Sequence, residues 1–215
     1  MIMQVHRTTK GAERLRSLKD IAANMFLEQG YEAVSLDTLI ARVGGSRRNI
    51  YSHFGGKEGL FIEAVTERCA ELAVPLEQLD IQGSDPKEAL VLFGHKILEI
   101  VLQPRALALH RLMIAEGQRF PELSQSIWHA GHSNATRLLA QWFEDRQRER
   151  HFRTDISAET LAAQFISLAV TTPQLRCLVG FGTSLNSAAI STVVGEAVCV
   201  FLDGAMTGRN GNQHA

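Results

Sequence analysis

Apolar residues recur at intervals of three and four along almost the whole 215-residue chain, and this periodicity limits the possible fold more than any other feature. Alternating aromatic and β-branched residues, which are typical of strands, never persist beyond a few positions. An apolar content of 45 % can fill a sizeable core in a chain of this length. The sequence therefore predicts an all-α fold.

Glycines, serines and prolines mark where the predicted helices begin and end. Ser35 and Ser46 are candidate N-caps, Gly30 is a natural helix stop, and the five prolines fall at or near helix ends. The predicted helices cover a short segment after Ser35 and, within a few residues, the ranges 12–29, 47–54, 57–74, 86–102, 104–117, 122–149, 157–171 and 187–206. We expect two domains, residues 1–62 and 63–215.

Charge is distributed unevenly along the chain although its formal net charge is only −1. Residues 1–60 carry nine Lys and Arg against six Asp and Glu, whereas residues 61–215 carry thirteen against seventeen. This concentration of positive charge near the N-terminus is a modest indication of a polyanionic partner there.

The stretch "VSLDTLIARVGGSRRNIYSHFGGKEGLF", residues 34–61, has the layout of a helix-turn-helix. Two short helices flank Gly44 and Gly45, and Ile50 and Phe54, four residues apart, share the inner face of the second. Packing must hold this second helix because seven or eight residues are too few for a stable isolated helix. Its outer face is then free to enter a groove of DNA.

Polar side chains of this stretch are the candidate DNA-binding residues. Arginine can fork onto guanine and asparagine can bridge adenine, so Arg47, Arg48 and Asn49 are expected at base edges. The remaining candidates suit phosphate or other anion contacts and are Tyr51, His53, Lys57, Ser35, Thr38 and Ser46. Charge alone would favour a merely solvated basic face, and the spacing is what favours DNA binding.

The same residues resemble a known family. The segment "IAANMFLEQGYEAVSLDTLIARVGGSRRNIYSHFGGKEGLF", within residues 18–65, is similar to the N-terminal domain of TetR-family transcriptional repressors. The resemblance implies that Tyr51, His53 and Lys57 grip phosphates and that Arg47 to Asn49 face bases. Two positions depart from the family pattern, because Gly45 replaces a common valine and Val34 a frequent threonine. These departures imply a looser turn and one phosphate contact fewer.

The C-terminal part also carries a resemblance. The segment "RLMIAEGQRFPELSQSIWHAG" is similar to the regulatory domain of the AefR-like subgroup over about residues 88–170, which implies a helical ligand-binding and dimerisation domain. The segments "AETLAAQFISLAV" and "AAISTVVGEAVCVFL" are apolar on more than one face. Helices of this kind must be covered from two sides, so we expect a homodimer that presents two recognition helices to a palindromic operator on double-stranded DNA.

Candidates for a small-molecule effector pocket are apolar residues of the larger domain, each of which could equally belong to the core. They are Phe93, Ile97, Met113, Trp128, Leu139, Trp142, Phe143 and Phe165. His129 and His132 have a spacing that can chelate a metal, but no acidic or cysteine ligand lies within a turn of them, so no metal or cofactor is expected. Three scattered cysteines, Cys69, Cys177 and Cys199, are interpreted as buried small apolar residues.

No phosphate loop, nucleophile elbow or other catalytic grouping occurs, so no enzyme activity is expected. No uninterrupted apolar run approaches the roughly 18 residues of a membrane span, and the first residues are polar, so we expect a cytoplasmic protein that does not contact a membrane. The preferred hypothesis is a repressor released from its operator by a small, apolar effector. The alternative is an all-α carrier or enzyme for hydrophobic molecules.

Overall fold

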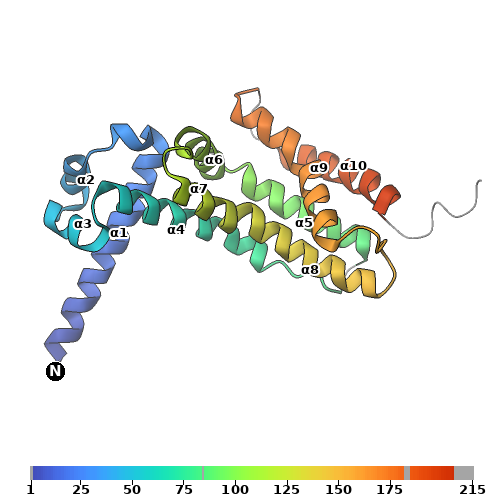
Figure 1. Ribbon diagram of the computed structural model, residues 1–215, viewed down its shortest axis with the longest axis horizontal. Helices are drawn as coiled ribbons and strands as arrows, with labels where there is room; N and C mark the ends of the chain where they lie inside the picture. The colour runs from blue at the N-terminus through green and yellow to red at the C-terminus, as the bar shows by residue number, and fades with distance from the viewer. Residues whose placement is uncertain (1, 84, 182–184, 206–215) are drawn as a thin grey trace, which may run out of the picture. The chain divides into compact units, whose positions relative to one another are not determined.

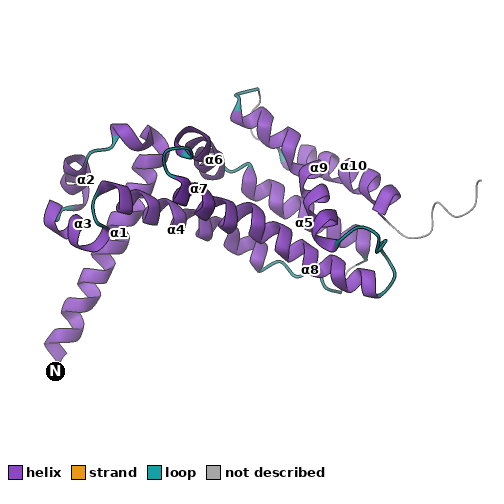
Figure 2. Cartoon of the chain, viewed as in Figure 1, coloured by secondary structure: helices purple, strands orange, loops and turns teal. Residues whose placement is uncertain are grey.

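The computed structural model describes residues 2–83, 85–181 and 185–205, with side chains from residue 11 onward. Within these ranges the chain is helical and has no strand, as the periodicity predicts (Figures 1 and 2). The elements are α1 (Ile2–Ala33), α2 (Leu36–Val43), α3 (Arg47–Phe54), α4 (Lys57–Glu77), α5 (Pro86–Val101), α6 (Pro104–Glu116), α7 (Pro121–Trp128), a π-helical turn (His129–Ser133), α8 (Asn134–Arg148), α9 (Ala158–Leu178) and α10 (Ser187–Ala205).

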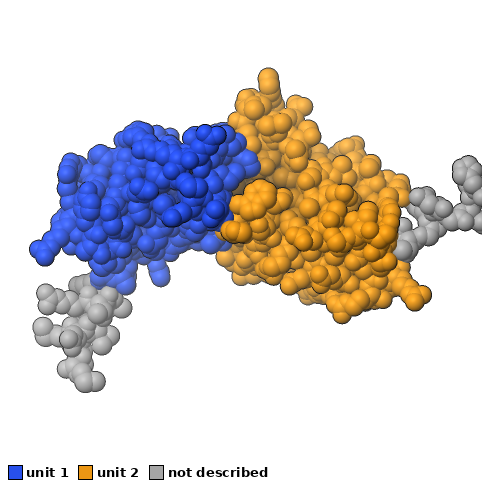
Figure 3. Space-filling model, viewed as in Figure 1, with its two compact units in different colours: residues 1–71, 108–127 blue, residues 72–107, 128–215 orange. Residues whose placement is uncertain are grey.

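The helices form two compact units (Figure 3). The first contains residues 1–71 and 108–127, and the second contains residues 72–107 and 128–215. The division therefore falls inside α4, and residues 108–127 pack with the N-terminal helices although they lie beyond residue 62 in the sequence.

An aromatic cluster forms the centre of the first unit. The ring of Tyr31 lies 4.9 Å from that of Phe61 and 4.6 Å from that of Phe120, and Phe26 lies 4.8 Å from Phe61. These four side chains come from α1, α4 and the residue before α7, and all are buried. Such edge-to-face and tilted ring pairs add to the stabilisation from apolar burial.

The second unit packs α5, α8, α9 and α10 around one core. Trp142 of α8 is fully buried and donates its indole N–H to the carbonyl of Ile81 at 3.1 Å, so its one polar atom is satisfied. Its ring lies 5.0 Å from Phe143 and 5.6 Å from Phe152. Phe165 of α9 in turn lies 5.3 Å from Phe201 of α10.

Two predicted helices after residue 120 differ from those of the structure. The predicted helix 122–149 is divided into α7, the π-helical turn and α8, because the backbone winds more widely over residues 129–133. The predicted helix 157–171 continues to Leu178 as α9, with Pro173 inside it. Pro173 is buried with Ala169 and Cys177 on the same helix, and this apolar burial offsets the backbone hydrogen bond that a proline cannot donate.

Three smaller expectations also need correction. Phe54 is only half-buried, so Ile50 alone of the predicted pair is fully inside. Cys199 is exposed, whereas Cys69 and Cys177 are buried as expected. Helix α1 begins ten residues before the predicted start, and its regular part is interrupted at Gly30, where φ is 79°. The end of α10 predicted at residue 206 lies outside the described residues.

One described helix, α10, is long and apolar enough to cross a membrane by length and composition. A core helix passes the same test, so this is a weak indication of a span. One face of α10 contributes Ile190, Val194 and Phe201 to the core of the second unit.

The burial of Ile50 leads to a stability prediction. Ile50 is 2 % exposed and is the one fully buried side chain of α3, so Ile50→Ala should lower the free energy of unfolding by about 2–5 kcal/mol. Ile114 on α6 is 67 % exposed, and Ile114→Ala should change it by less than about 0.5 kcal/mol. Denaturant unfolding of both variants measures the difference. Equal losses would show that α3 is not held by Ile50.

Candidate DNA-binding surface

Helix α3 is short but is capped at both ends. Its N-cap Ser46 accepts a hydrogen bond from the backbone N–H of Asn49 at 3.3 Å. At the other end Gly55 adopts the left-handed conformation with φ 74°, and its N–H donates to the carbonyl of Tyr51 at 3.0 Å. Both ends therefore stop where the sequence predicts, and the helix direction is fixed by local hydrogen bonds as well as by Ile50.

The turn between α2 and α3 depends on its two glycines. Gly44 has φ 73° and Gly45 has φ 118°, and side-chain-bearing residues rarely adopt either value. A valine at position 45 would be strained in this backbone. Gly45 is thus required by the conformation of the turn.

Five side chains of α3 that were predicted to face DNA are exposed to solvent, namely those of Arg47, Arg48, Asn49, Tyr51 and His53. Tyr51 is the most apolar of them and is 58 % exposed. Among the described residues, Arg48 takes part in no salt bridge. The basic start of α3 is therefore not folded back against the protein.

Arg47 differs from Arg48 because it has an acidic partner. Its Nε donates to Oδ1 of Asp37 at 2.9 Å and its Nη2 donates to Oδ2 at 2.5 Å, which is a bidentate pair. Hydrogen bonding from Arg47 lowers the pKa of the Asp37 carboxyl. Asp37 was not among the predicted site residues, although its place in the first turn of α2 is evident from the sequence.

Two of the hydroxyls expected to bind anions already form hydrogen bonds at the start of α2. Ser35 is the N-cap, and its Oγ accepts from the N–H of Thr38 at 3.0 Å. The hydroxyl of Thr38 lies 2.7 Å from the same Oγ. These two residues lie together at the exposed start of the helix, next to Asp37.

Lys57 is held in place rather than extended into solvent. Its Nζ lies 4.1 Å from the centroid of the Tyr31 ring and donates to the carbonyl of Glu32 at 3.4 Å. Arg119 lies 5.1 Å from the same ring and forms a salt bridge with Glu32. Burial of the Tyr31 hydroxyl raises its pKa, so the ring remains neutral beside both cations.

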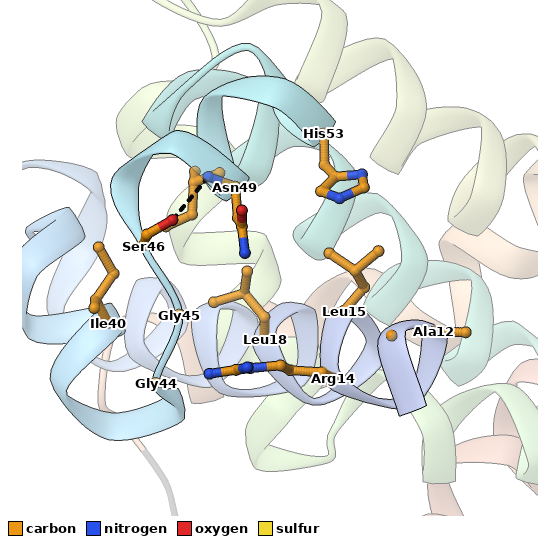
Figure 4. Close-up of a pocket in the computed structure, with 12 residues that line it drawn as sticks. Ala12, Arg14, Leu15, Leu18, Ile40, Gly44, Gly45, Ser46, Asn49 and His53 are labelled. Atoms are coloured by element: carbon orange, nitrogen blue, oxygen red, sulfur yellow. Dashed lines mark hydrogen bonds between the residues drawn. The ribbon is translucent and has the colours of Figure 1, made fainter. Parts of the chain in front are cut away.

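A hollow of about 490 Å³ lies beside α3 within the first unit (Figure 4). Asn49 and His53 lie on its α3 side, with Leu15 and Leu18 of α1 opposite. Arg14 also lines the hollow, and its Nη2 would be 2.8 Å from a Cβ placed on Gly44. A cation of α1 therefore lies next to the turn between α2 and α3, which sequence spacing did not reveal.

The residues predicted to line an effector pocket do not all come together. The second unit buries six of the eight in one core cluster, namely Phe93, Ile97, Leu139, Trp142, Phe143 and Phe165. Trp128 is 50 % exposed, and its ring lies 4.3 Å from that of His132. Met113 belongs to the first unit and is partly exposed.

Two family profiles match the chain. The profile described as bacterial regulatory proteins of the tetR family matches residues 19–64, and the profile of the C-terminal domain of AefR-like transcriptional repressors matches residues 88–204. The first covers α2, α3 and the residues that flank them, and the second covers more than half of the chain.

Individual relatives are transcriptional regulators as well. The chain is 36 % identical over 90 residues to the HTH-type transcriptional regulator YxaF of Bacillus subtilis, a match covering 41 % of this chain and 47 % of YxaF. It is 35 % identical over 71 residues to the HTH-type transcriptional repressor AcnR of Corynebacterium diphtheriae, covering 33 % and 37 %. The chain thus spans less than half of the length of these relatives.

Solved structures are similar over nearly the whole chain. A TetR-family regulator of Mesorhizobium loti superposes with a TM-score of 0.82 at 20 % identity, and the flavonoid-responsive regulator FrrA with a TM-score of 0.78 at 26 % identity. Each comparison covers 91 % of this chain and 98 % of the other. The chain therefore belongs to the TetR family of DNA-binding transcriptional regulators, and its C-terminal part is of the AefR-like type.

Proposed function

We propose that this regulator is a homodimeric repressor that binds a palindromic operator through α3 and is released from it by a small apolar effector. The observation that carries the DNA-binding part is the capped start of α3, where the side chains of Arg47, Arg48 and Asn49 are exposed to solvent. Residues at the start of a recognition helix contact base edges in helix-turn-helix proteins. In this proposal the repressor acts in the cytoplasm.

The roles of the polar residues differ in this proposal. Arg48 reads a base, because it is exposed and can present a bidentate fork to guanine. Tyr51, His53 and Lys57 contact phosphates and set the register of α3 on the duplex. The cation–π contact between Lys57 and the Tyr31 ring limits the freedom of the ammonium group before DNA is bound.

A gel shift with operator and random DNA at several salt concentrations tests these roles. Lys57→Ala should weaken binding to both DNAs and reduce the salt slope by about 0.9, because one phosphate contact is lost. Arg48→Ala should change sequence preference at one base pair by about 1–3 kcal/mol. Lys87→Ala on α5 removes one positive charge from the second unit and should leave the affinity for both DNAs and the salt slope unchanged. An equal loss on operator and random DNA for Arg48→Ala would contradict base reading.

Apolar side chains on the outside of α9 and α10 support the homodimer. Leu168, Leu175 and Val179 are exposed and stand seven and four residues apart, so they lie along one side of α9 and its C-cap. Val200 is likewise exposed on α10. A two-fold pairing of these helices covers their apolar surface and provides the second copy of α3 that a palindrome requires.

The dimer is tested by placing a charge on this surface. Leu175 is 55 % exposed in the single chain, so Leu175→Glu should fold but shift the protein from dimer to monomer, because the carboxylate would be buried unpaired at the interface. Leu92→Glu, on the exposed face of α5, is the matched control. Sedimentation equilibrium measures both. A dimer of unchanged affinity in Leu175→Glu would place the interface elsewhere.

The effector is assigned to the second unit, whose helices supply six of the eight candidate pocket residues. Release requires that the effector bind the DNA-incompetent arrangement more tightly than the competent one, by about 1–3 kcal/mol for a typical coupling. The similar regulator FrrA is flavonoid-responsive. Flavonoids are small aromatic molecules and are the first class to test for release in the gel shift.

Within the first unit, the residues between α6 and α7 provide a contact through which release could reach the DNA-binding surface. Arg119 pairs with Glu32 and lies over Tyr31, and Phe120 packs on the same ring at 4.6 Å. The ring of Tyr31 also contacts the ammonium group of Lys57. A shift of the α6–α7 connection would therefore disturb a residue proposed to bind phosphate.

Removing Arg119 tests this contact without knowledge of the effector. Arg119→Ala should weaken operator binding several-fold while the dimer persists, because Tyr31 loses a partner and Lys57 is less well held. Arg105→Ala, an exposed arginine near the start of α6, removes the same charge and should leave operator binding unchanged. Fluorescence anisotropy with labelled operator measures both variants. Identical operator affinities for Arg119→Ala and Arg105→Ala would show that Arg119 does not influence the DNA-binding surface.

A further inference from the structure

The salt bridge between Asp37 and Arg47 connects the first turns of the two helices of the motif. Asp37 is the second residue of α2 and Arg47 the first residue of α3. The two side chains are 68 % and 63 % exposed, so the pair lies on the surface where α3 begins. It is the base-reading candidate Arg47, rather than a remote arginine, that carries this acidic partner.

The geometry of the pair leaves part of the guanidinium free. An arginine has five N–H groups, and Asp37 accepts from Nε and from Nη2. The remaining N–H groups, two on Nη1 and one on Nη2, form a second edge with fork geometry. Arg47 can therefore hold Asp37 and still offer two donors to a guanine.

We propose that Asp37 is a positioning residue for sequence recognition, which orients the free edge of Arg47 and cancels its charge. This inference rests on the proposed entry of α3 into the major groove. Arg47 then contributes to the choice among sequences and little to the general attraction for DNA. Arg48, with no salt bridge among the described residues, keeps its full charge beside it.

Two physical effects support this division. An arginine fixed by a bidentate carboxylate has lost much of its side-chain freedom before DNA arrives, so less is lost on forming a base contact. The carboxylate also repels phosphates, which disfavours complexes in which Arg47 swings onto the backbone. Because hydrogen bonding from Arg47 lowers the pKa of Asp37, the carboxylate is ionised at neutral pH and the pair is intact there.

Asp37→Asn is the decisive variant, because it retains the size of the side chain and removes the charge. Affinity for random DNA should rise and its salt slope should steepen by about 0.9, since Arg47 becomes a free phosphate-binding cation. The ratio of operator to random affinity should fall by roughly fivefold or more, at the lower limit of what a bidentate base contact contributes. Anisotropy titrations with both DNAs over a salt series give these quantities.

Glu28→Gln is the matched control, because it removes one negative charge from exposed α1 in the same unit. Any general charge effect appears in both variants and leaves the affinity ratio unchanged. If Asp37→Asn raises affinity for both DNAs equally, or leaves ratio and slope as in the wild type, Asp37 does not position Arg47. Failure of the wild-type protein to bind any operator would instead contradict the proposed function.

A second set of variants covers the case in which Asp37→Asn unfolds. Asp37→Glu retains the charge but moves the carboxylate by one methylene group, so the affinity ratio should fall while the salt slope stays constant. In an Arg47→Ala background, substitution of Asp37 should no longer change the ratio, because the residue it positions is absent. A persistent effect in that background would show that Asp37 acts through another group and would overturn the proposal.

Discussion

The burial of Ile50 beneath α3 is the interaction on which the DNA-binding part depends. An eight-residue helix is too short to persist by backbone hydrogen bonding alone, and Ile50 is the one fully buried side chain that joins α3 to the unit. Ser46 and Gly55 then decide where the helix starts and stops. Ile50 and the half-buried Phe54 hold the inner face of α3, and the exposed side chains of Arg47, Arg48 and Tyr51 are available to a partner.

The basic residues around α3 differ in the side chains that they contact as well as in their exposure. Arg47 is paired with Asp37, Lys57 sits over Tyr31, and Arg48 carries its charge without a salt bridge in the described chain. Three basic residues close in sequence thus have three different environments. A DNA-binding surface with such differences can separate general attraction to phosphates from discrimination among bases.

The second unit differs from the first because its helices are apolar on more than one face. Helix α9 buries Phe165 and Ala169 in the core and still exposes Leu168 and Leu175. Core packing also explains why Pro173 lies inside a helix, where local preference alone would end it. The same buried aromatic side chains that were considered for an effector pocket provide this core, and a single sequence cannot separate the two roles since both require large apolar residues.

The sequence alone determined the all-α class, the helix-turn-helix and most helix ends, because these depend on caps, glycines and apolar spacing within a few residues of each other. It also identified the exposed basic residues of α3. Only the tertiary structure revealed three contacts between distant residues. Asp37 pairs with Arg47, ten residues away, and Arg119 pairs with Glu32, 87 residues away. Arg14 lies at the turn that contains Gly44. Those contacts depend on how helices pack, and helix packing is decided by the combined shape of many side chains rather than by any local pattern.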